Sequence, residues 1–422
     1  MQPKDRLEPQ PWMTTPETVA VMAALAAAGG EARFVGGCVR DTLLGRKVSD
    51  VDIATQEPPE RVMNLLARAG IKAIPTGITH GTVTAVIGSK HFEITTLRRD
   101  VESYGRHAKV EYTDDWQADA ARRDFTINAL FCGIDGALYD PFGGLDDLRT
   151  RRVRFVGDPE ARIREDVLRL LRFFRFYAHY GNSAPDPAAL AACSRLAHLL
   201  PTLSGERVCG ETLKLVIAPE PAGVVELMRE TGVLAHFLPE ATRIDRLRAM
   251  VTIEATLTRH MARRADPIRR LAALLDGNER SAVAVATRLR FSNAERDRLV
   301  GLADDAELSP DLPAPARRRL IYRYGRDRYC DLVLLRWAEA MTQGAAVDQV
   351  NDSWLGLLRA GAEWNAPRFP LKGRDAVRLG VPPGPAVGRL MATIEDWWIA
   401  GDFQADRSTC LAKLQDLVPT AT

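Results

Sequence analysis

Several absences narrow the classes of protein to which this sequence can belong. The six cysteines are scattered from Cys38 to Cys410 and form no CxxC pair. That spacing argues against a zinc site or a disulfide framework, and it suits a reducing compartment. The apolar run at 19–28 lacks a basic flank directly before it and is too short to cross a bilayer. We therefore expect a cytoplasmic protein with no secretion signal and no membrane contact.

An excess of charge is also missing. The 57 Lys and Arg residues are balanced by 55 Asp and Glu, which leaves a formal net charge of +2. Any nucleic-acid site must then come from a local basic surface. With 46% hydrophobic and 27% charged residues, the composition is that of a folded protein. Because 422 residues exceed one ordinary core, about two to four domains are expected.

The pattern of apolar residues changes near residue 150. Before it, helical and strand-like stretches alternate, which indicates an α/β arrangement with a mixed sheet. After about 155, Leu-, Ala- and Arg-rich stretches with helical spacing continue to the end of the sequence. The expected elements of the first part are helices at 16–28 and 58–69 and strands at 32–35, 48–54, 82–87 and 91–97.

The first chemical signal is a glycine pair followed by two aspartates. The run GGCVRD at 36–41 precedes Asp50 and Asp52. Two residues apart in a strand, these carboxylates would lie on one face with Cα atoms about 6.6 Å apart, and could share a divalent ion. Gly37 would let the backbone approach a triphosphate, and Arg40 would neutralise part of its charge. Alone, the aspartate pair would equally fit a solvated turn.

A third carboxylate could complete such a site. Glu93 lies on a strand expected to neighbour the aspartates, although an ordinary strand residue is an equally good reading. Further along, RRDFTINA at 122–129 places Asp124 and Asn128 four residues apart, on one face of an expected helix. They could bond ribose hydroxyls while Arg123 reaches a phosphate. A helix cap with a buried Asn is the structural alternative.

The segment EDVLRLLRFFRF at 165–176 is the most informative expected helix. Asp166 and Arg169 together offer acceptors and donors to the edge of a base, while Arg172 and Arg175 suit a triphosphate. A surface helix with intrahelical salt bridges is the alternative. However, the apolar residues between the arginines indicate an inward face, where unpaired arginines would be costly without an anion.

Together these motifs resemble the nucleotidyltransferase superfamily of the DNA polymerase β type. More narrowly, they resemble the class II family of tRNA nucleotidyltransferases and poly(A) polymerases, strongly over 34–215 and moderately over 369–403. The resemblance implies an α+β fold with a polymerase-β-type head and an all-helical neck, body and tail. The expected domains are the head at 1–150, the neck at 151–215, the body at 216–345 and a tRNA-contacting tail at 346–422.

The resemblance also assigns roles to residues. Asp50 and Asp52 would bind the two catalytic Mg²⁺ ions, and Asp166 and Arg169 would select CTP and then ATP. A further motif around Arg207 would support the helix that carries these base readers. The full expected set of nucleotide contacts is Gly37, Arg40, Arg123, Asp166, Arg169, Arg172 and Arg175.

The choice between tRNA and poly(A) rests on details. Residues 75–77 and 80–84 (PTG and HGTVT) stand where poly(A) polymerases usually carry a basic segment, and the foldable runs at 371–375 and 384–388 resemble a tRNA-clamping tail. The expected reaction is template-independent addition of CCA to tRNA 3′ ends from CTP and ATP, with release of pyrophosphate. Poly(A) polymerase, CC-only or A-only addition, and a non-catalytic RNA-binding relative stay as alternatives. No obligate protein partner is inferred.

Two further segments carry expectations. The charged stretch at 98–116 contains Gly105 and shows no clear helical or strand period. We expect it to be mobile and to order the site when specificity changes from CTP to ATP. Trp397 and Trp398, at helical spacing with Ile394, are expected to belong to a core and not to a base-stacking platform.

Overall fold

The computed structural model describes the chain apart from residues 28, 105–106, 262–263, 304–306, 345–346 and 419–422, and apart from the side chains of 100–104, 107–110, 259–261 and 347–351. Contacts divide the chain into two compact units. The first comprises 1–239 with 288–290, and the second comprises 240–287 with 291–422. Residues 216–239, which were expected to begin the body, pack in the first unit because α10 contacts α7 and α9.

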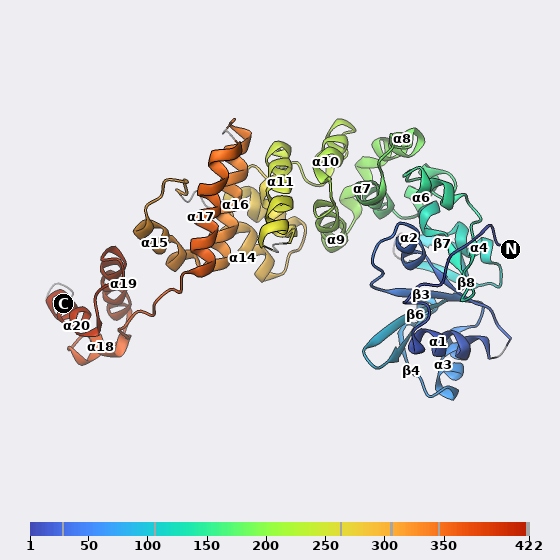
Figure 1. The fold of residues 1–422 in the computed structure, drawn as a ribbon, viewed down its shortest axis with the longest axis horizontal. Helices are drawn as coiled ribbons and strands as arrows, with labels where there is room; N and C mark the ends of the chain where they lie inside the picture. Colours follow the sequence, from blue (N-terminus) through green and yellow to red (C-terminus); the bar gives the residue numbers. More distant parts are fainter. Residues whose placement is uncertain (28, 105–106, 262–263, 304–306, 345–346, 419–422) are drawn as a thin grey trace. The chain divides into compact units, whose positions relative to one another are not determined.

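The first unit contains an eight-stranded mixed sheet (Figure 1). Its order is β1-β10-β9-β2-β3-β6-β5-β4, and the β3–β6 pair is parallel whereas its other pairs are antiparallel. The strands are β1 (Asp5–Arg6), β2 (Ala32–Val35), β3 (Val51–Thr55), β4 (Lys72–Gly77), β5 (Thr82–Ile87), β6 (Lys90–Thr96), β9 (Phe131–Cys132) and β10 (Ala137–Tyr139).

Helices make up most of the rest of the described chain. In the first unit they are α1 (Pro16–Ala26), α2 (Gly37–Leu43), α3 (Pro59–Arg68), α4 (Trp116–Ala121), α5 (Gly144–Arg149), α6 (Pro159–Glu165), α7 (Leu168–Tyr180), α8 (Pro187–Leu196), α9 (Gly205–Val216) and α10 (Pro221–Glu230). From there on they are α11 (Ile244–Met261), α12 (Pro267–Leu274), α13 (Glu279–Arg288), α14 (Asn293–Gly301), α15 (Ala314–Tyr324), α16 (Arg326–Thr342), α17 (Val347–Glu363), α18 (Gly373–Arg378), α19 (Pro385–Ala400) and α20 (Arg407–Leu417).

Local sequence signals explain several boundaries. Thr15 caps α1 by accepting a hydrogen bond from the Thr18 backbone N–H, and Pro16 occupies the first helical position. Gly88, at φ +58°, turns the chain between β5 and β6. The α+β class and the mixed sheet that the sequence predicts are therefore confirmed.

Two local expectations differ from the structure. The strand expected at 48–54 begins only at Val51, so Asp50 lies in the preceding loop and Asp52 is the second strand residue. The segment 98–116, expected to lack regular structure, pairs as β7 (Arg98–Tyr104) and β8 (His107–Tyr112) before α4 begins. The sequence of this segment shows no regular alternation of polar and apolar residues because β7 and β8 form a small sheet of their own, separate from the main sheet and its core. Gly105 lies outside the described residues, and the expected mobility stays a prediction.

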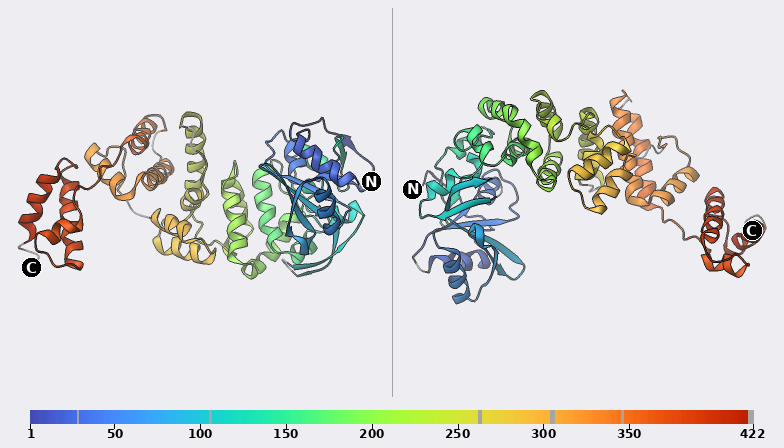
Figure 2. Two further views of the ribbon diagram at one scale, coloured as in Figure 1. Left: turned by 90° about the horizontal axis from the view of Figure 1, so that it is seen from below. Right: turned by 180° about the vertical axis from the view of Figure 1, so that it is seen from behind.

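The second unit is helical throughout its described part. Helix α16 packs against α11 and α17, while α18, α19 and α20 lie side by side near the C-terminus (Figure 2). These last helices share a core that contains Ile394, Leu414 and Trp398, the last only 3% exposed. The prediction that this tryptophan belongs to a core is confirmed. No described helix of either unit is long and apolar enough to cross a membrane.

Candidate active site

Three acidic side chains gather where β3 and β6 run in parallel, and we call them the carboxylate edge: Asp50, Asp52 and Glu93. Asp52 and Glu93 are register partners on the two strands. Asp50 precedes β3, is exposed, and accepts a hydrogen bond of 2.7 Å from the Ser49 hydroxyl. The fold therefore brings Glu93, on a strand about forty residues later, beside the predicted aspartate pair.

The electrostatics of the carboxylate edge are unfavourable for one of its members. Burial, followed by the charges of Glu93 and Asp50, raises the pKa of Asp52 to about 6, although Arg123 and Arg40 oppose the shift. A half-buried aspartate beside like charges is disfavoured in its ionised form. A cation bound there would offset that repulsion, because it supplies the missing opposite charge.

The donor set at the carboxylate edge fits a hard divalent cation. Carboxylate oxygens are the ligands that Mg²⁺ takes, and it is usually held by one or two of them together with waters and substrate phosphates. Within the described ranges, no group of three or more His, Cys, Asp and Glu side chains is arranged as a ready-made metal cage. The edge is therefore suited to an ion that a substrate phosphate helps to hold.

The predicted glycine turn lies close to a predicted arginine. Gly36 adopts φ +69° before α2 begins at Gly37. A Cβ built on Gly36 would lie 3.7 Å from Arg123 Nη1 and 3.6 Å from the Asn128 carbonyl oxygen. Since the positive φ disfavours other residue types, the turn needs glycine here, and it keeps the backbone open beside a guanidinium.

The Arg123 side chain is held in place by a buried carboxylate, Asp119. Its Nη2 donates to Asp119 Oδ2 at 2.9 Å, and Arg122 pairs with the other oxygen of Asp119 at 2.6 Å. Asp119 is 1% exposed, so burial alone would raise its pKa, but the charges of Arg123 and Arg122 lower it. Sequence reasoning missed Asp119, although an acid three or four residues before two arginines is a recognisable helical signal.

The segment around Asp124 is not the regular helix that its spacing predicts. Helix α4 ends at Ala121, and only a 3₁₀ turn (Thr126–Asn128) follows. Asp124 and Asn128 still meet, since the Asn128 amide donates to Asp124 Oδ1 at 2.9 Å. The 3₁₀ turn brings them together because the Phe125 backbone is extended before it.

Asp124 faces the neck and not an open cleft. Its Oδ2 accepts from Arg172 Nε at 2.7 Å, and although burial opposes it, the Arg172 charge lowers the pKa of Asp124 to about 2. Arg40, which is 7% exposed, donates to Asn128 Oδ1 at 2.6 Å and to Asp41. The Asp124–Arg172 hydrogen bond thus joins the head to α7, and the Arg40–Asn128 bond holds α2 against the 3₁₀ turn within the head.

The predicted base readers do not sit on one helix. Helix α6 ends at Glu165, Asp166 is extended, and α7 begins at Leu168, so Asp166 lies at the junction. Asp166 accepts from Arg207 of α9 at 2.7 Å. Arg169 donates to Glu165 at 2.5 Å and to the Arg122 carbonyl at 3.1 Å. The continuous helix expected over 165–176 is therefore interrupted at Asp166, and the two side chains have different partners, while their role as base readers stays a prediction.

The expectation of unpaired arginines is also wrong. Arg172 pairs with Asp124, and Arg175 Nε lies 3.0 Å from Glu211 Oε2 on α9. The missing acids come from other elements, which periodicity within one helix cannot show. Arg207, whose motif was predicted to have a supporting role, and Glu211 on the same helix are the direct partners of predicted nucleotide contacts. We call the whole set the neck network: Asp124, Glu165, Asp166, Arg169, Arg172, Arg175, Arg207 and Glu211.

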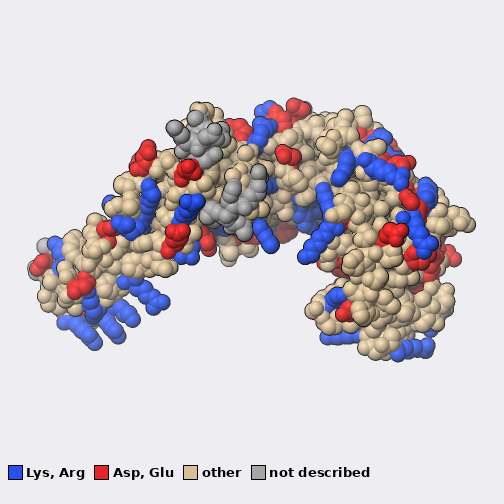
Figure 3. All heavy atoms as spheres, viewed as in Figure 1, with Lys and Arg blue, Asp and Glu red and all other residues tan. Residues whose placement is uncertain are grey.

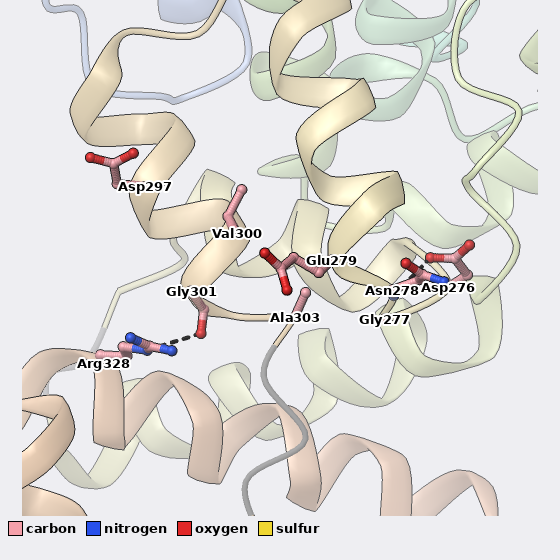
Figure 4. A pocket seen from close by; sticks show the side chains of 9 residues that line it. All are labelled: Asp276, Gly277, Asn278, Glu279, Asp297, Val300, Gly301, Ala303 and Arg328. Atoms are coloured by element: carbon pink, nitrogen blue, oxygen red, sulfur yellow. Dashed lines mark hydrogen bonds between the residues drawn. The ribbon is translucent and has the colours of Figure 1, made fainter.

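A cavity lies in the second unit, away from the residues described above. It has a volume of about 860 Å³ and is lined by the 276–279 turn, the end of α14 and Arg328 of α16 (Figure 4). Arg328 donates to the Gly301 carbonyl at 2.9 Å. Asp276, Glu279 and Asp297 give the cavity an acidic lining. An acidic lining repels phosphate, so this cavity does not suit an RNA backbone.

Two family models match parts of the chain. Residues 32–154 match the Poly A polymerase head domain, which includes the carboxylate edge and Arg123. Residues 184–244 match the model described as the probable RNA and SrmB-binding site of polymerase A. Both matches lie largely in the first unit.

Individual relatives match over nearly the whole chain. A mitochondrial CCA tRNA nucleotidyltransferase 1 of Danio rerio is 35% identical over 91% of this chain and 87% of its own length. A CCA-adding enzyme of Levilactobacillus brevis is 30% identical over 94% and 96%, respectively. Among solved structures, the CCA-adding enzyme of Bacillus stearothermophilus in complex with CTP has a TM-score of 0.78 at 29% identity, covering 96% of this chain and 99% of that one.

Proposed function

The chain belongs to the family of CCA tRNA nucleotidyltransferases, and we propose that it adds CCA to tRNA 3′ ends by a metal-dependent reaction at the carboxylate edge. CTP and ATP supply the nucleotides. The RNA 3′-oxygen forms a bond to the α-phosphorus, and the bond to the β-phosphate oxygen breaks, releasing pyrophosphate. The observation that carries the proposal is the meeting of Asp50, Asp52 and Glu93 within a head that matches the family.

In this proposal Asp50 and Asp52 hold Mg²⁺. Once bound, two such ions would stabilise charge on the attacking and leaving oxygens of phosphoryl transfer. The raised pKa of Asp52 supports the assignment, because a site that repels its own charge binds a cation with less competition from internal ion pairs. Glu93 is our candidate for a third ligand or for a carboxylate that orients Asp52.

Recognition of the incoming nucleotide is assigned to the neck network and the glycine turn. Gly37 follows the turn at Gly36, and Arg123 lies beside that turn with its charge acting on Asp52; both are proposed to take the triphosphate. Asp166 and Arg169 are proposed to read the base, each held in place by its own partner. Arg172 fixes the neck to Asp124, and its remaining exposed part can face a phosphate.

Binding of the tRNA body is proposed to involve the tail. Lys and Arg side chains gather on the tail near α18 in the view of Figure 3. Lys372, Arg374, Arg378 and Arg389 are exposed, whereas Asp375 is buried and pairs with Arg407. Exposed cations without a matching exposed acid favour contact with an RNA backbone.

The cellular compartment stays a proposal. Cysteine usage predicts the cytoplasm, yet the relatives from Danio rerio, Mus musculus and Homo sapiens are named mitochondrial. Both compartments contain tRNA and keep thiols reduced, so the six free cysteines agree with either.

A primer-extension assay tests the reaction. Purified protein is incubated with a tRNA that ends before CCA, with CTP, ATP and Mg²⁺, and products are separated by length. Three added residues with both nucleotides, two with CTP alone, and none with a chelator are expected. Addition of long A tails to an unstructured RNA from ATP alone would identify a poly(A) polymerase instead. A product that stops after two residues with both nucleotides would identify a CC-adding enzyme.

A further inference from the structure

The backbone of residues 122 and 123 is bound by the helices of the neck. Arg169 Nη2 donates to the Arg122 carbonyl oxygen at 3.1 Å. Arg162 of α6 donates to the carbonyl oxygens of both residues, and its bond to the Arg123 oxygen is 2.8 Å long. Arg123 itself is the proposed triphosphate contact, and Arg169 is a proposed base reader. The two contacts therefore depend on the same short piece of backbone.

On the head side, one acid fixes this piece of backbone. Asp119 lies in α4 and is 1% exposed. Its oxygens accept from the guanidinium groups of Arg122 and Arg123 and from the backbone N–H of Arg98, the first residue of β7. Within the described part of the chain, every ion pair of Arg122 or Arg123 is with Asp119.

The two arginines need this carboxylate because they are largely removed from water. The Arg122 and Arg123 side chains are only 15% and 17% exposed, respectively. Burial lowers the pKa of Arg122 to about 10, and the charge of Asp119 opposes that shift. Without Asp119, two neighbouring guanidinium groups would be largely buried without the acid that pairs with both, which is strongly destabilising. Neutralising Asp119 should therefore move the residues that carry these groups.

On the neck side, the contacts continue from the same backbone to the base reader. Arg162 is 8% exposed and pairs with Glu165. Glu165 also accepts from Arg169 at 2.5 Å, and Arg169 donates to the Arg162 carbonyl oxygen at 3.0 Å. The Arg169 guanidinium is thus held between a neck carboxylate and the Arg122 carbonyl oxygen. Its position consequently depends on where the head places that oxygen.

A small displacement at such a point matters, because a misplacement of about 1 Å can cost an enzyme about 100-fold in rate. We propose that Asp119 is a positioning residue for nucleotide selection. It fixes the 122–123 backbone, and thereby sets Arg123 toward the triphosphate and Arg169 toward the base at the same time. This inference rests on the proposed function. It links nucleotide affinity and base choice to one buried carboxylate whose own oxygens are already engaged.

Asp119→Asn tests the assignment, because it removes the charge and keeps the size of the side chain. Single-nucleotide addition to tRNA is measured with each of the four triphosphates. KM for CTP and ATP should rise about tenfold, and discrimination against UTP and GTP should fall about tenfold, because both arginines are displaced. KM for tRNA should stay unchanged. An acid with only a structural role would lower the melting temperature and the active fraction, but not KM or discrimination.

The matched control is Asp331→Asn in the second unit. Asp331 is 2% exposed and also pairs with two arginines, Arg269 at 2.8 Å and Arg298 at 2.6 Å. This variant should lower the melting temperature and leave nucleotide KM and discrimination at the wild-type values. Equal changes of KM and discrimination in the two variants would overturn the proposal, since the loss of any buried ion pair would then have the same effect.

Arg122→Gln provides an independent test that also decides the matter if Asp119→Asn does not fold. It leaves Asp119 paired with Arg123 and releases only the Arg122 side chain, so discrimination should fall about threefold with a smaller rise in KM. Unchanged discrimination in the folded variants would overturn the proposal. CCA addition by the wild type is scored in the same reactions. A wild type that adds CCA while the variants keep their selectivity refutes only the positioning role, whereas a wild type that adds no CCA refutes the proposed function as well.

Discussion

The carboxylate edge and the neck network differ in charge balance: the acids of the edge lie beside one another, whereas those of the network pair with arginines. At the edge, Asp50, Asp52 and Glu93 lie together, and the pKa of Asp52 is raised to about 6, by burial first and then by its neighbours' charges. In the network, Asp124 is buried more deeply than Asp52, but Arg172 lowers its pKa to about 2. Unbalanced charge marks the place where a ligand must supply the opposite sign. Balanced charge builds a rigid frame around that place.

The largest effect is expected at the carboxylate edge. Asp52→Asn should reduce nucleotide addition by more than about 100-fold, because it removes a proposed metal ligand, while tRNA binding stays close to wild type. Ionised Asp52 is disfavoured in the folded state, so the neutral amide should leave the melting temperature at neutral pH unchanged or higher. Primer extension and a thermal melt measure the two effects.

Asp114→Asn serves as the control for that variant, because Asp114 is an exposed aspartate outside the edge. Activity of Asp52→Asn comparable to that of this control would refute the assignment of the active site. A strongly lowered melting temperature would instead mean that Asp52 stabilises the fold, and the contrast with the network would be lost.

The next effect concerns stability, in the neck network. Asp124→Ala leaves the Arg172 guanidinium without its main partner, and it should lower the free energy of unfolding by about 3 kcal/mol. Asp146→Ala, which removes one of the two acidic partners of exposed Arg149, should cost less than about 1 kcal/mol. Urea denaturation measures both. Equal costs would show that the network is no more than a set of surface ion pairs.

The same position gives a pH signature. Because the folded pKa of Asp124 is depressed from 3.8 to about 2, its contribution to stability is present above pH 3.8 and is lost as pH falls toward 2. Asp124→Asn should flatten the pH dependence of the free energy of unfolding in that window. An unchanged slope would mean that other carboxylates dominate acid unfolding.

Base selection should change by a smaller amount. Asp166→Ala removes a proposed acceptor to the base, and discrimination against UTP and GTP should weaken by about 1–3 kcal/mol. Arg195→Ala, which breaks an exposed pair with Glu160, should leave selectivity unchanged. Single-nucleotide incorporation with each of the four triphosphates measures the ratio. A uniform loss of rate without misincorporation would mean that Asp166 only positions Arg207 and α9.

The smallest expected effect belongs to the paired strands β7 and β8. Replacing their tips with a short turn should slow addition of the final A about tenfold, equivalent to about 1.4 kcal/mol, and leave CC addition intact. Product lengths over time report both steps. Equal slowing of all three additions would assign the hairpin to general binding and not to the change of nucleotide.

Sequence alone predicted the elements whose signals are local. Thr15 and Pro16 began α1, the turn at Gly88 between two strand-like runs marked β5 and β6, and Asp-x-Asp after a glycine pair pointed to phosphoryl transfer. The helical spacing that placed Trp398 in a core also held, because burial of one face follows directly from periodicity. The mixed-sheet head and helical remainder followed from the same reasoning.

Only the tertiary structure determined which side chains pair with one another. Glu93 meets Asp52 because β3 and β6 are parallel neighbours separated by two other strands in the sequence. Arg172 finds Asp124, and Asp166 finds Arg207, across 48 and 41 residues, respectively. Helical spacing could place these arginines on a face but could not name their acids, since an ion pair depends on distance in space. The same holds for Arg40 of α2 and Arg175 of α7, which come together around one small cavity only once the chain has folded.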